Sequence, residues 1–124
     1  MTGIELVHEA LRLINYTNPR GEVDTHQAAE VMQRSLTLVN TILADVQKIE
    51  GKPVVRLAQL SDELMVEDDT AYNVMPWGVG MLIAQSAGDG DNQQLCAAMY
   101  NQKRGSIQRP SYTRRDALPT PWSE

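Results

Sequence analysis

Residues 25–50 read THQAAEVMQRSLTLVNTILADVQKIE, and this stretch decides the fold. Apolar and small side chains recur in it at alternating steps of three and four, the spacing of one face of an α-helix. Two shorter rows beside the main one widen the apolar surface to about half of the helix circumference. The main row is Ala28, Met32, Ser35, Val39, Ile42, Val46 and Ile49, and the side rows are Ala29, Leu36 and Leu43, and Val31 and Leu38.

So wide an apolar surface predicts neighbours on two sides, because a stripe of about 100° is enough to pack on one neighbour. We therefore expect this helix, which would be about 39 Å long at 1.5 Å per residue, to be the spine of a bundle. A lone coiled coil is disfavoured, because the apolar arc is wider than a coiled-coil seam and the flanking charge pattern is weak.

A second amphipathic helix precedes it, over about residues 3–15. Thr2 and Glu5 have the spacing of a capping box. Apolar side chains then fill one half of the helical wheel and polar side chains the other half. The sequence NPRG at residues 18–21 predicts a break between the two helices.

Residues 52–68 are ambiguous, and we expect a short irregular segment there. Its first half, PVVRLAQL at residues 53–60, contains β-branched side chains and would suit an extended segment or a hairpin arm. The second half, from Ser61 to Asp69, reads as a turn or one turn of helix.

A third helix is expected within residues 69–87, with Pro76 either kinking it or standing at its true start. Its apolar residues occupy most faces, so it is predicted to be the most buried helix. A fourth helix would begin at an acidic cap, Asp91, and run to Arg104, with Gly105 ending it. Its inward side chains are predicted to be Leu95, Cys96, Met99 and Tyr100.

Gly78 and Gly80 lie inside the third helix, where each costs about 1 kcal/mol relative to alanine. That cost suggests close approach of a neighbouring backbone, including that of another subunit. The candidate subunit-interface residues are Trp77, Gly78, Gly80, Val31 and Leu38.

Charge divides the chain into two parts. The whole chain has a formal net charge of −5, but residues 1–102 sum to −8 and residues 103–124 to +3. Three prolines in the C-terminal part forbid a continuous helix. We therefore predict a helical domain over residues 1–105 and a flexible arm over residues 106–124 that becomes ordered on a partner. The expected arm anchors are Ile107, Arg109, Pro110, Tyr112, Arg114, Arg115, Leu118 and Trp122. The plainer alternative is a disordered terminus with no partner.

The chain has 124 residues and a single cysteine, Cys96, so it suits one domain without an internal disulfide. No apolar run is long enough for a membrane span, and no basic region precedes an apolar stretch as in a signal peptide. We expect no membrane association.

Catalytic and metal-binding patterns are missing from the sequence. His8 and His26 lack partners at metal-ligand spacing, and Asp89 starts no complete calcium loop. Cys96 has no histidine near it in the sequence and is expected in the core. We predict no cofactor, no metal and no enzymatic activity.

The sequence MPWGVGMLIAQ at residues 75–85, followed by GDGDN at 88–92 and YNQKR at 100–104, resembles the head–tail adaptor proteins of tailed bacteriophages and prophages. These are also called neck, head-completion or packaged-DNA-stabilising tail accessory proteins. The order of the expected elements is also similar over residues 2–105, although residues 52–68 match least well.

The resemblance implies an all-α fold, a small four-helix bundle with one long central helix and an extended C-terminal arm. It also implies a structural virion protein that forms a ring, commonly a dodecamer, below the portal protein ring. Such a ring bridges the portal to tail or stopper proteins and helps to retain the packaged genome. Double-stranded DNA would pass through it without sequence-specific binding. The implied location is the virion neck, and the host cytoplasm during assembly.

The alternative is a small helical regulatory or partner-binding domain, including one that associates with nucleic acid. None of the four expected helices is basic, as a recognition helix in a DNA groove would be. Non-specific contact of the basic arm with phosphates stays open.

Overall fold

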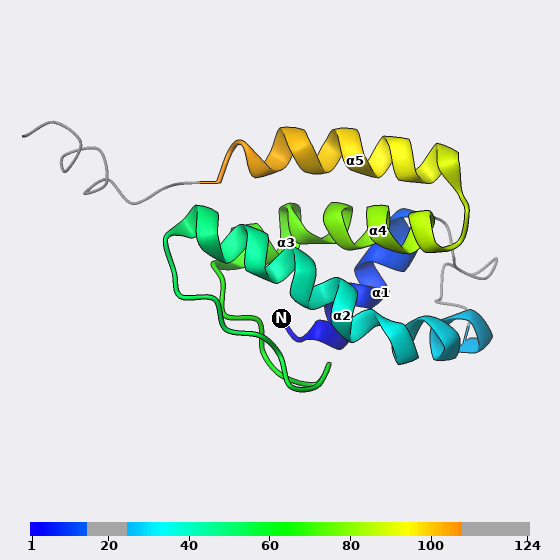
Figure 1. Ribbon diagram of the computed structural model, residues 1–124, viewed down its shortest axis with the longest axis horizontal. Helices are drawn as coiled ribbons and strands as arrows, with labels where there is room; N and C mark the ends of the chain where they lie inside the picture. The colour runs from blue at the N-terminus through cyan, green and yellow to red at the C-terminus, as the bar shows by residue number, and fades with distance from the viewer. Residues whose placement is uncertain (15–24, 108–124) are drawn as a thin grey trace, which may run out of the picture.

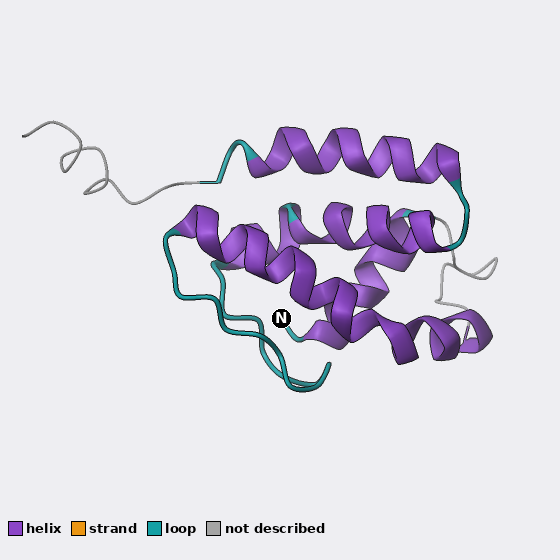
Figure 2. Cartoon of the chain, viewed as in Figure 1, coloured by secondary structure: helices purple, strands orange, loops and turns teal. Residues whose placement is uncertain are grey.

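The computed structural model describes residues 1–14 and 25–107, with the side chains of the long helix described from residue 34 onward. It is an all-α bundle, as predicted (Figure 1). The helices of the described part are α1 (Gly3–Leu13), α2 (Thr25–Glu50), α3 (Asp68–Asn73), α4 (Met75–Ser86) and α5 (Gly90–Arg104). Residues 52–67 form the predicted irregular segment, drawn as a loop that projects below the ends of α2 and α3 (Figure 2).

The helix at the centre of the bundle is α4, which packs against α1, α2, α3 and α5. Seven of its twelve residues are buried, so the prediction of the most buried helix is confirmed. The prediction that the long helix is the spine is corrected, because α2 packs mainly on α1 and α4. The reason lies in the outer face of α2, where Thr37, Thr41 and Lys48 are exposed.

Local signals at the helix ends are mostly confirmed. The N–H of Glu5 donates to Thr2 Oγ1 at 3.2 Å and the N–H of Thr2 donates to Glu5 Oε1 at 2.9 Å, which completes the capping box of α1. A break at Val74 separates α3 from α4, so Pro76 stands in the first turn of α4 and does not kink a longer helix.

The start of α5 differs by two residues from the prediction. Asp89, not Asp91, caps the helix, and its Oδ1 accepts a hydrogen bond from the N–H of Asn92 at 3.2 Å. Cys96 and Tyr100 point inward as predicted, whereas Leu95 is 52% exposed. The prediction for Leu95 was wrong because α5 contributes a narrow buried stripe to the bundle.

The two glycines of α4 allow close packing inside the chain. A Cβ atom on Gly78 would lie 2.8 Å from Tyr100 Cε1 and 2.9 Å from Ile42 Cδ1. A Cβ atom on Gly80 would lie 3.3 Å from Cys96 Sγ. Close packing at these glycines is therefore confirmed, but the nearest neighbours are side chains of α2 and α5 of the same chain and not a neighbouring backbone. As subunit-interface residues, Gly78 and Gly80 are a wrong prediction, because both are buried.

The core lies between α1, α2 and α4 and is mostly apolar, although Ser35 and Gln47 are also fully buried. Its fully buried large side chains include Leu6, Leu11, Ile14, Leu43, Met75 and Val79. No helix within the described part of the chain is both long and apolar enough to cross a lipid bilayer.

Candidate functional site

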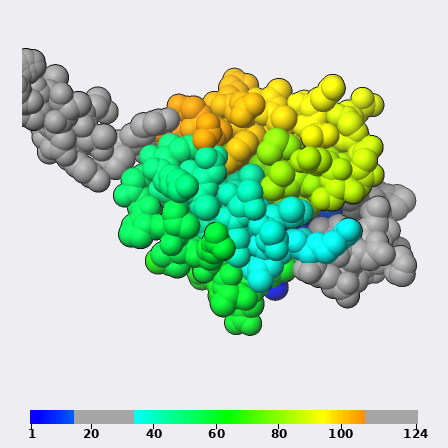
Figure 3. Space-filling view, viewed as in Figure 1, coloured from blue at the N-terminus to red at the C-terminus, as the bar shows by residue number. Residues whose placement is uncertain are grey.

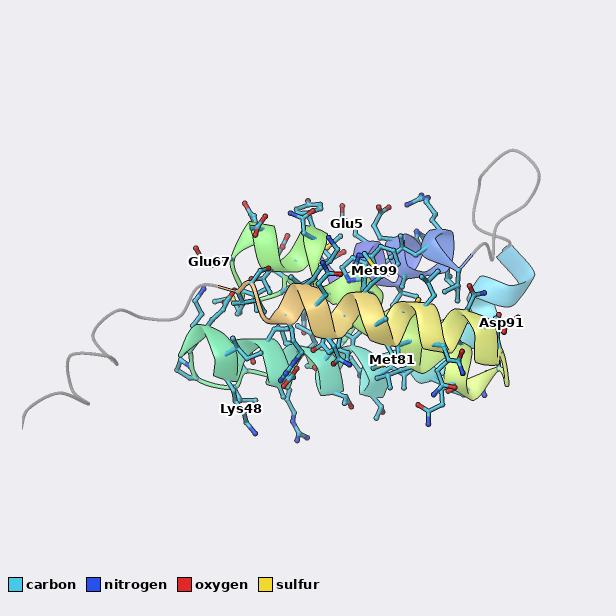
Figure 4. The ribbon with its side chains drawn as sticks, turned by 90° about the horizontal axis from the view of Figure 1, so that it is seen from above. Glu5, Lys48, Glu67, Met81, Asp91 and Met99 are labelled. Atoms are coloured by element: carbon cyan, nitrogen blue, oxygen red, sulfur yellow. The ribbon has the colours of Figure 1, made fainter. Side chains whose placement is uncertain are left out.

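The candidate site lies at the end of the bundle where α5 terminates, and it contains contacts that the sequence did not predict. Figure 4 shows Lys48 and Glu67 at this end and Asp91 at the opposite one. Here the last residues of α2 and α5, the start of α3 and the irregular segment meet. The C-terminal segment of the chain begins at the same place.

Asp45 on α2 ties down the last turn of α5. Its Oδ2 accepts hydrogen bonds from Tyr100 Oη at 2.6 Å and from Arg104 Nε at 2.8 Å, and its Oδ1 accepts one from Arg104 Nη2 at 2.7 Å. The arginine therefore binds the carboxylate through two parallel bonds, the strongest geometry for this pair. This Asp45 cluster fixes the point from which the chain leaves the bundle.

The same contacts shift the ionisation of the cluster. The hydrogen bond from Arg104, and then that from Tyr100, lowers the pKa of Asp45 below its usual value. Burial, reinforced by the hydrogen bond to Asp45, raises the pKa of the Tyr100 hydroxyl. Both groups stay in one charge state throughout the neutral range, which suits a structural tie and not proton transfer.

Ile107 requires a correction. It was predicted as a partner-binding residue of the arm, but it is only 9% exposed and belongs to the hydrophobic core. Its N–H donates to the carbonyl of Arg104 at 3.3 Å, and the N–H of Ser106 donates to that of Lys103 at 3.0 Å. Two residues beyond the predicted boundary thus remain part of the helical domain.

The carboxylate of Glu50, at the end of α2, is buried beside Ile107, with its side chain 3% exposed. It accepts a hydrogen bond from Thr70 Oγ1 at 2.5 Å and lies 3.3 Å from Lys52 Nζ. Lys52 also contacts Glu67 at 2.7 Å, and this hydrogen bond raises the pKa of Lys52. The lysine therefore bridges two glutamates from different elements.

An acidic pocket of about 340 Å³ opens at this position. We call it the acidic pocket; its lining consists of Glu50, Glu67, Asp69, Thr70, Ser106 and Ile107. Glu67 and Asp69 are exposed at its rim. The rim is therefore negatively charged at the place where the basic C-terminal segment begins.

Two side-chain amides of α2 hold the irregular segment. The Asn40 side chain accepts from the N–H of Leu57 at 2.8 Å and donates to its carbonyl at 3.1 Å. Gln47, seven residues later, accepts from the N–H of Val55 at 2.9 Å and donates to the carbonyls of Val55 and Met65 at 3.3 and 3.2 Å. These bonds replace a neighbouring β-strand, so the segment is fixed without belonging to a sheet.

The returning half of the segment is held by the N-terminus. The N–H of Ile4 donates to the carbonyl of Leu60 at 2.9 Å, and the N–H of Leu64 donates to that of Met1 at 2.9 Å. Thr2 and Glu63 form an isolated antiparallel bridge. Both halves of the segment are thus bound to helices or to the chain end through their backbones.

An apolar groove of about 410 Å³ lies on this segment. Its lining consists of Lys52, Pro53, Val55, Leu64, Met65 and Val66, and we call it the apolar groove. Val55 and Met65 are exposed in it, as is their neighbour Val54. Half of the large exposed hydrophobic side chains in the described part of the protein therefore lie in this one segment.

The remaining interface candidates lie elsewhere. Trp77 and Leu38 are half-buried on α4 and α2, and Figure 3 shows α4 partly uncovered between α2 and α5. Figure 4 places Met81 on the α2 side of α5 and Met99 on the α1 side. The side chain of Val31 lies outside the described residues, as do Arg109, Pro110, Tyr112, Arg114, Arg115, Leu118 and Trp122.

The described side chains contain no cluster of histidine, cysteine, aspartate and glutamate that could hold a metal ion. Cys96 is buried in the core as predicted, and burial raises the pKa of its thiol. A buried thiol of this kind is a poor nucleophile.

Sequence reasoning missed Asp45, Asn40 and Gln47. A signal for the two amides was present, because they lie seven residues apart, two turns along one face of α2. No periodic signal pointed to Asp45, whose partners are 55 and 59 residues away. With this geometry described, comparison with known proteins adds no identity: the chain matches no protein-family model, no curated protein and no solved structure.

Proposed function

We propose that this protein is a head–tail adaptor of a tailed bacteriophage or prophage, a structural component that forms a ring below the portal. The order of the helices supports this proposal. A capped amphipathic helix, a long helix, an irregular segment, a helix pair and a C-terminal segment follow one another as in the adaptor proteins that the sequence resembles.

The observation that carries the proposal is the firm attachment of the C-terminal segment's first residues. The Asp45 cluster holds the last turn of α5, and Ile107 is buried directly beyond it. Three arginines and two aromatic residues follow within residues 108–124. A segment that starts from a fixed point and bears such side chains suits docking into a partner, and we assign the portal ring as that partner.

Ring formation would use the uncovered side of α4. Trp77 and Leu38 are the interface residues that this proposal retains from the sequence, since Gly78 and Gly80 are inside the chain. The acidic surface of residues 1–102, with a net charge of −8, would repel DNA from the channel wall and let it slide. Tail or stopper proteins would bind the opposite side of the ring.

The test uses portal rings from the same phage genome and compares the full chain with a version ending at Ile107. Light scattering of the mixture should show many copies of the full chain on each portal ring and none of the shortened one. The deletion starts at residue 108, because removing Ile107 would disturb the core. Binding of the shortened chain would contradict docking through the segment, and failure of the full chain to bind would contradict the adaptor function.

A matched variant separates charge from length. Replacing Arg109, Arg114 and Arg115 by alanine keeps the segment but removes its positive charge, and it should weaken portal binding strongly in low salt. Salt-sensitive binding of the unassembled chain to duplex DNA, without portal binding, would instead favour the nucleic-acid-associated alternative.

A further inference from the structure

We propose that the apolar groove binds the side chain of Tyr112 from the same chain, so that the C-terminal segment folds back on the irregular segment in the free protein. This inference concerns the unassembled chain and does not depend on the adaptor function.

The groove is a rigid and preformed surface. Gln47 holds the backbone of Val55 on one wall and that of Met65 on the other, with three hydrogen bonds between 2.9 and 3.3 Å. Its side chain is fully buried, so the walls are fixed relative to each other. A preformed apolar groove needs little ordering before it accepts a side chain.

The groove is also unusually apolar for a surface. Of its lining residues, Val55 and Met65 are 48% and 59% exposed. Exposed apolar side chains gathered around one groove are typical of a binding surface. Its volume of about 410 Å³ accommodates one aromatic ring with room for the adjoining backbone.

The position of the groove favours the chain's own C-terminal segment as the occupant. The described chain ends at Ile107, which lines the acidic pocket together with Glu50 and Glu67. Lys52 contacts both glutamates through its ammonium group and also lines the apolar groove. Lys52 therefore connects the apolar groove with the two glutamates of the pocket that Ile107 also lines.

The spacing of residues in the segment matches this short path. Tyr112 follows Ile107 by five residues, which span at most about 17 Å when extended. Arg109 lies between them in the sequence, and the exposed carboxylate of Asp69 at the pocket rim offers complementary charge. The order of side chains along the segment thus matches the order of surfaces. Ile107 is buried, the basic Arg109 follows it, for the acidic rim, and the aromatic Tyr112 comes last, for the apolar groove.

Binding within one chain is favoured over binding between copies. A short tether gives the second contact an effective concentration in the millimolar range. A neighbouring copy in dilute solution cannot compete with that concentration. The groove is therefore occupied by Tyr112 of the same chain.

The first test uses a single fluorescent reporter in the full chain. Tyr112→Trp is introduced together with Trp77→Phe and Trp122→Phe, which leaves one tryptophan. The emission should lie at shorter wavelength than that of a solvated indole, at all protein concentrations. Adding Met65→Asp should move it to the solvated position, because a carboxylate then occupies the apolar groove.

Leu95→Asp is the matched control, because Leu95 is similarly exposed but lies on α5 and does not line the groove. It should leave the emission unchanged. Emission that ignores Met65→Asp would overturn the proposal, and a shift that appears only at high concentration would assign the occupant to a second copy. The emission of native Trp122 can be measured in a Trp77→Phe chain. If Met65→Asp shifts the emission of Trp122 but not that of the tryptophan at position 112, the choice of Tyr112 is overturned.

A second measurement needs no change at the tryptophans. Trypsin cleaves after Arg114 and Arg115, and docking of Tyr112 should protect these nearby bonds. We expect cleavage about tenfold slower in the unmodified chain than in Met65→Asp, which corresponds to about 1.4 kcal/mol. Equal rates in the two chains would contradict docking even if the reporter variants fail to fold.

Discussion

The helical core and the irregular segment at residues 52–67 are stabilised in different ways. The core of α1, α2 and α4 is held by fully buried apolar side chains, such as Leu11 and Leu43. The irregular segment buries Leu57 and Leu64 in the core but leaves Val54, Val55 and Met65 exposed. It is also held through its backbone, by Asn40 and Gln47. The irregular segment therefore has an exposed apolar surface that does not pack against the core. Such a surface is available for binding.

The largest expected effect is in the core. Leu11→Ala should lower the free energy of unfolding by about 3 kcal/mol, because Leu11 is fully buried and the surrounding helices cannot close the cavity completely. Leu95→Ala, a matched leucine on the surface of α5, should change it by less than about 0.5 kcal/mol. Chemical unfolding followed by circular dichroism measures both. Equal losses would contradict the difference in burial.

A smaller loss is expected where side-chain amides hold the segment. Gln47→Leu keeps the volume but leaves the N–H and C=O of Val55 and the C=O of Met65 without their partner, which should cost about 2 kcal/mol. Gln59→Leu, at an exposed position of the same segment, is the control. Hydrogen exchange should accelerate at the Val55 amide in the first variant only. Protection that survives Gln47→Leu would show that the segment is held by other contacts.

The Asp45 cluster should show a pH-dependent effect. Asp45→Asn weakens the bonds to Tyr100 and Arg104 and should cost about 1–2 kcal/mol at neutral pH, since the ion pair is partly exposed. The pKa of Asp45 is lowered in the folded chain, so its stabilisation is present above the ordinary value of 3.8 and is lost as the pH falls through the lowered pKa. Unfolding curves of the two chains should therefore converge in acid. A gap that stays constant down to pH 2 would contradict this assignment.

The smallest expected effect is at Thr2, which belongs to both regions. Thr2→Ala removes the cap of α1 beside the bridge to Glu63 and should cost about 1 kcal/mol. Thr41→Ala, in the interior of α2 on its exposed side, should be neutral or slightly stabilising, because alanine is the better helix former. Thermal unfolding of the pair measures the difference, and an equal effect of both changes would mean that the cap contributes nothing.

These two regions also differ in how far they could be predicted. Several helix ends were predicted well from local signals, such as the capping box at Thr2 and the glycine at position 105. At Pro76 the sequence left a kink and a helix start both open. Periodicity identified buried faces on α1 and α2 but failed for Leu95, because a helical wheel does not tell how wide a stripe the neighbouring helices cover. The small residues Gly78 and Gly80 predicted close packing, but nothing local says whether the neighbour belongs to the same chain.

The candidate site was predicted less well, because its contacts join residues far apart in the sequence. Ile107 was predicted to belong to the arm because prolines follow it in the sequence. In the structure its apolar side chain is buried, and it lines the same pocket as Glu50. Asn40 and Gln47 look like ordinary polar residues of a helix until the backbone of residues 55–57 lies against them. The proposed adaptor function and the docking of Tyr112 stay predictions until the experiments above are done.

Hydrogen bonding through the main chain has a consequence for how this protein can diverge or be engineered. Asn40 and Gln47 bind peptide groups, which are the same for nearly every amino acid. The side chains at positions 53–56 can therefore be exchanged without loss of the segment's path, except for proline at Val55, where the N–H is needed. Leu57 is not exchangeable in this way, because its side chain is buried in the core. Substitutions on this surface can therefore change what the protein binds, while the helices beneath it stay the same.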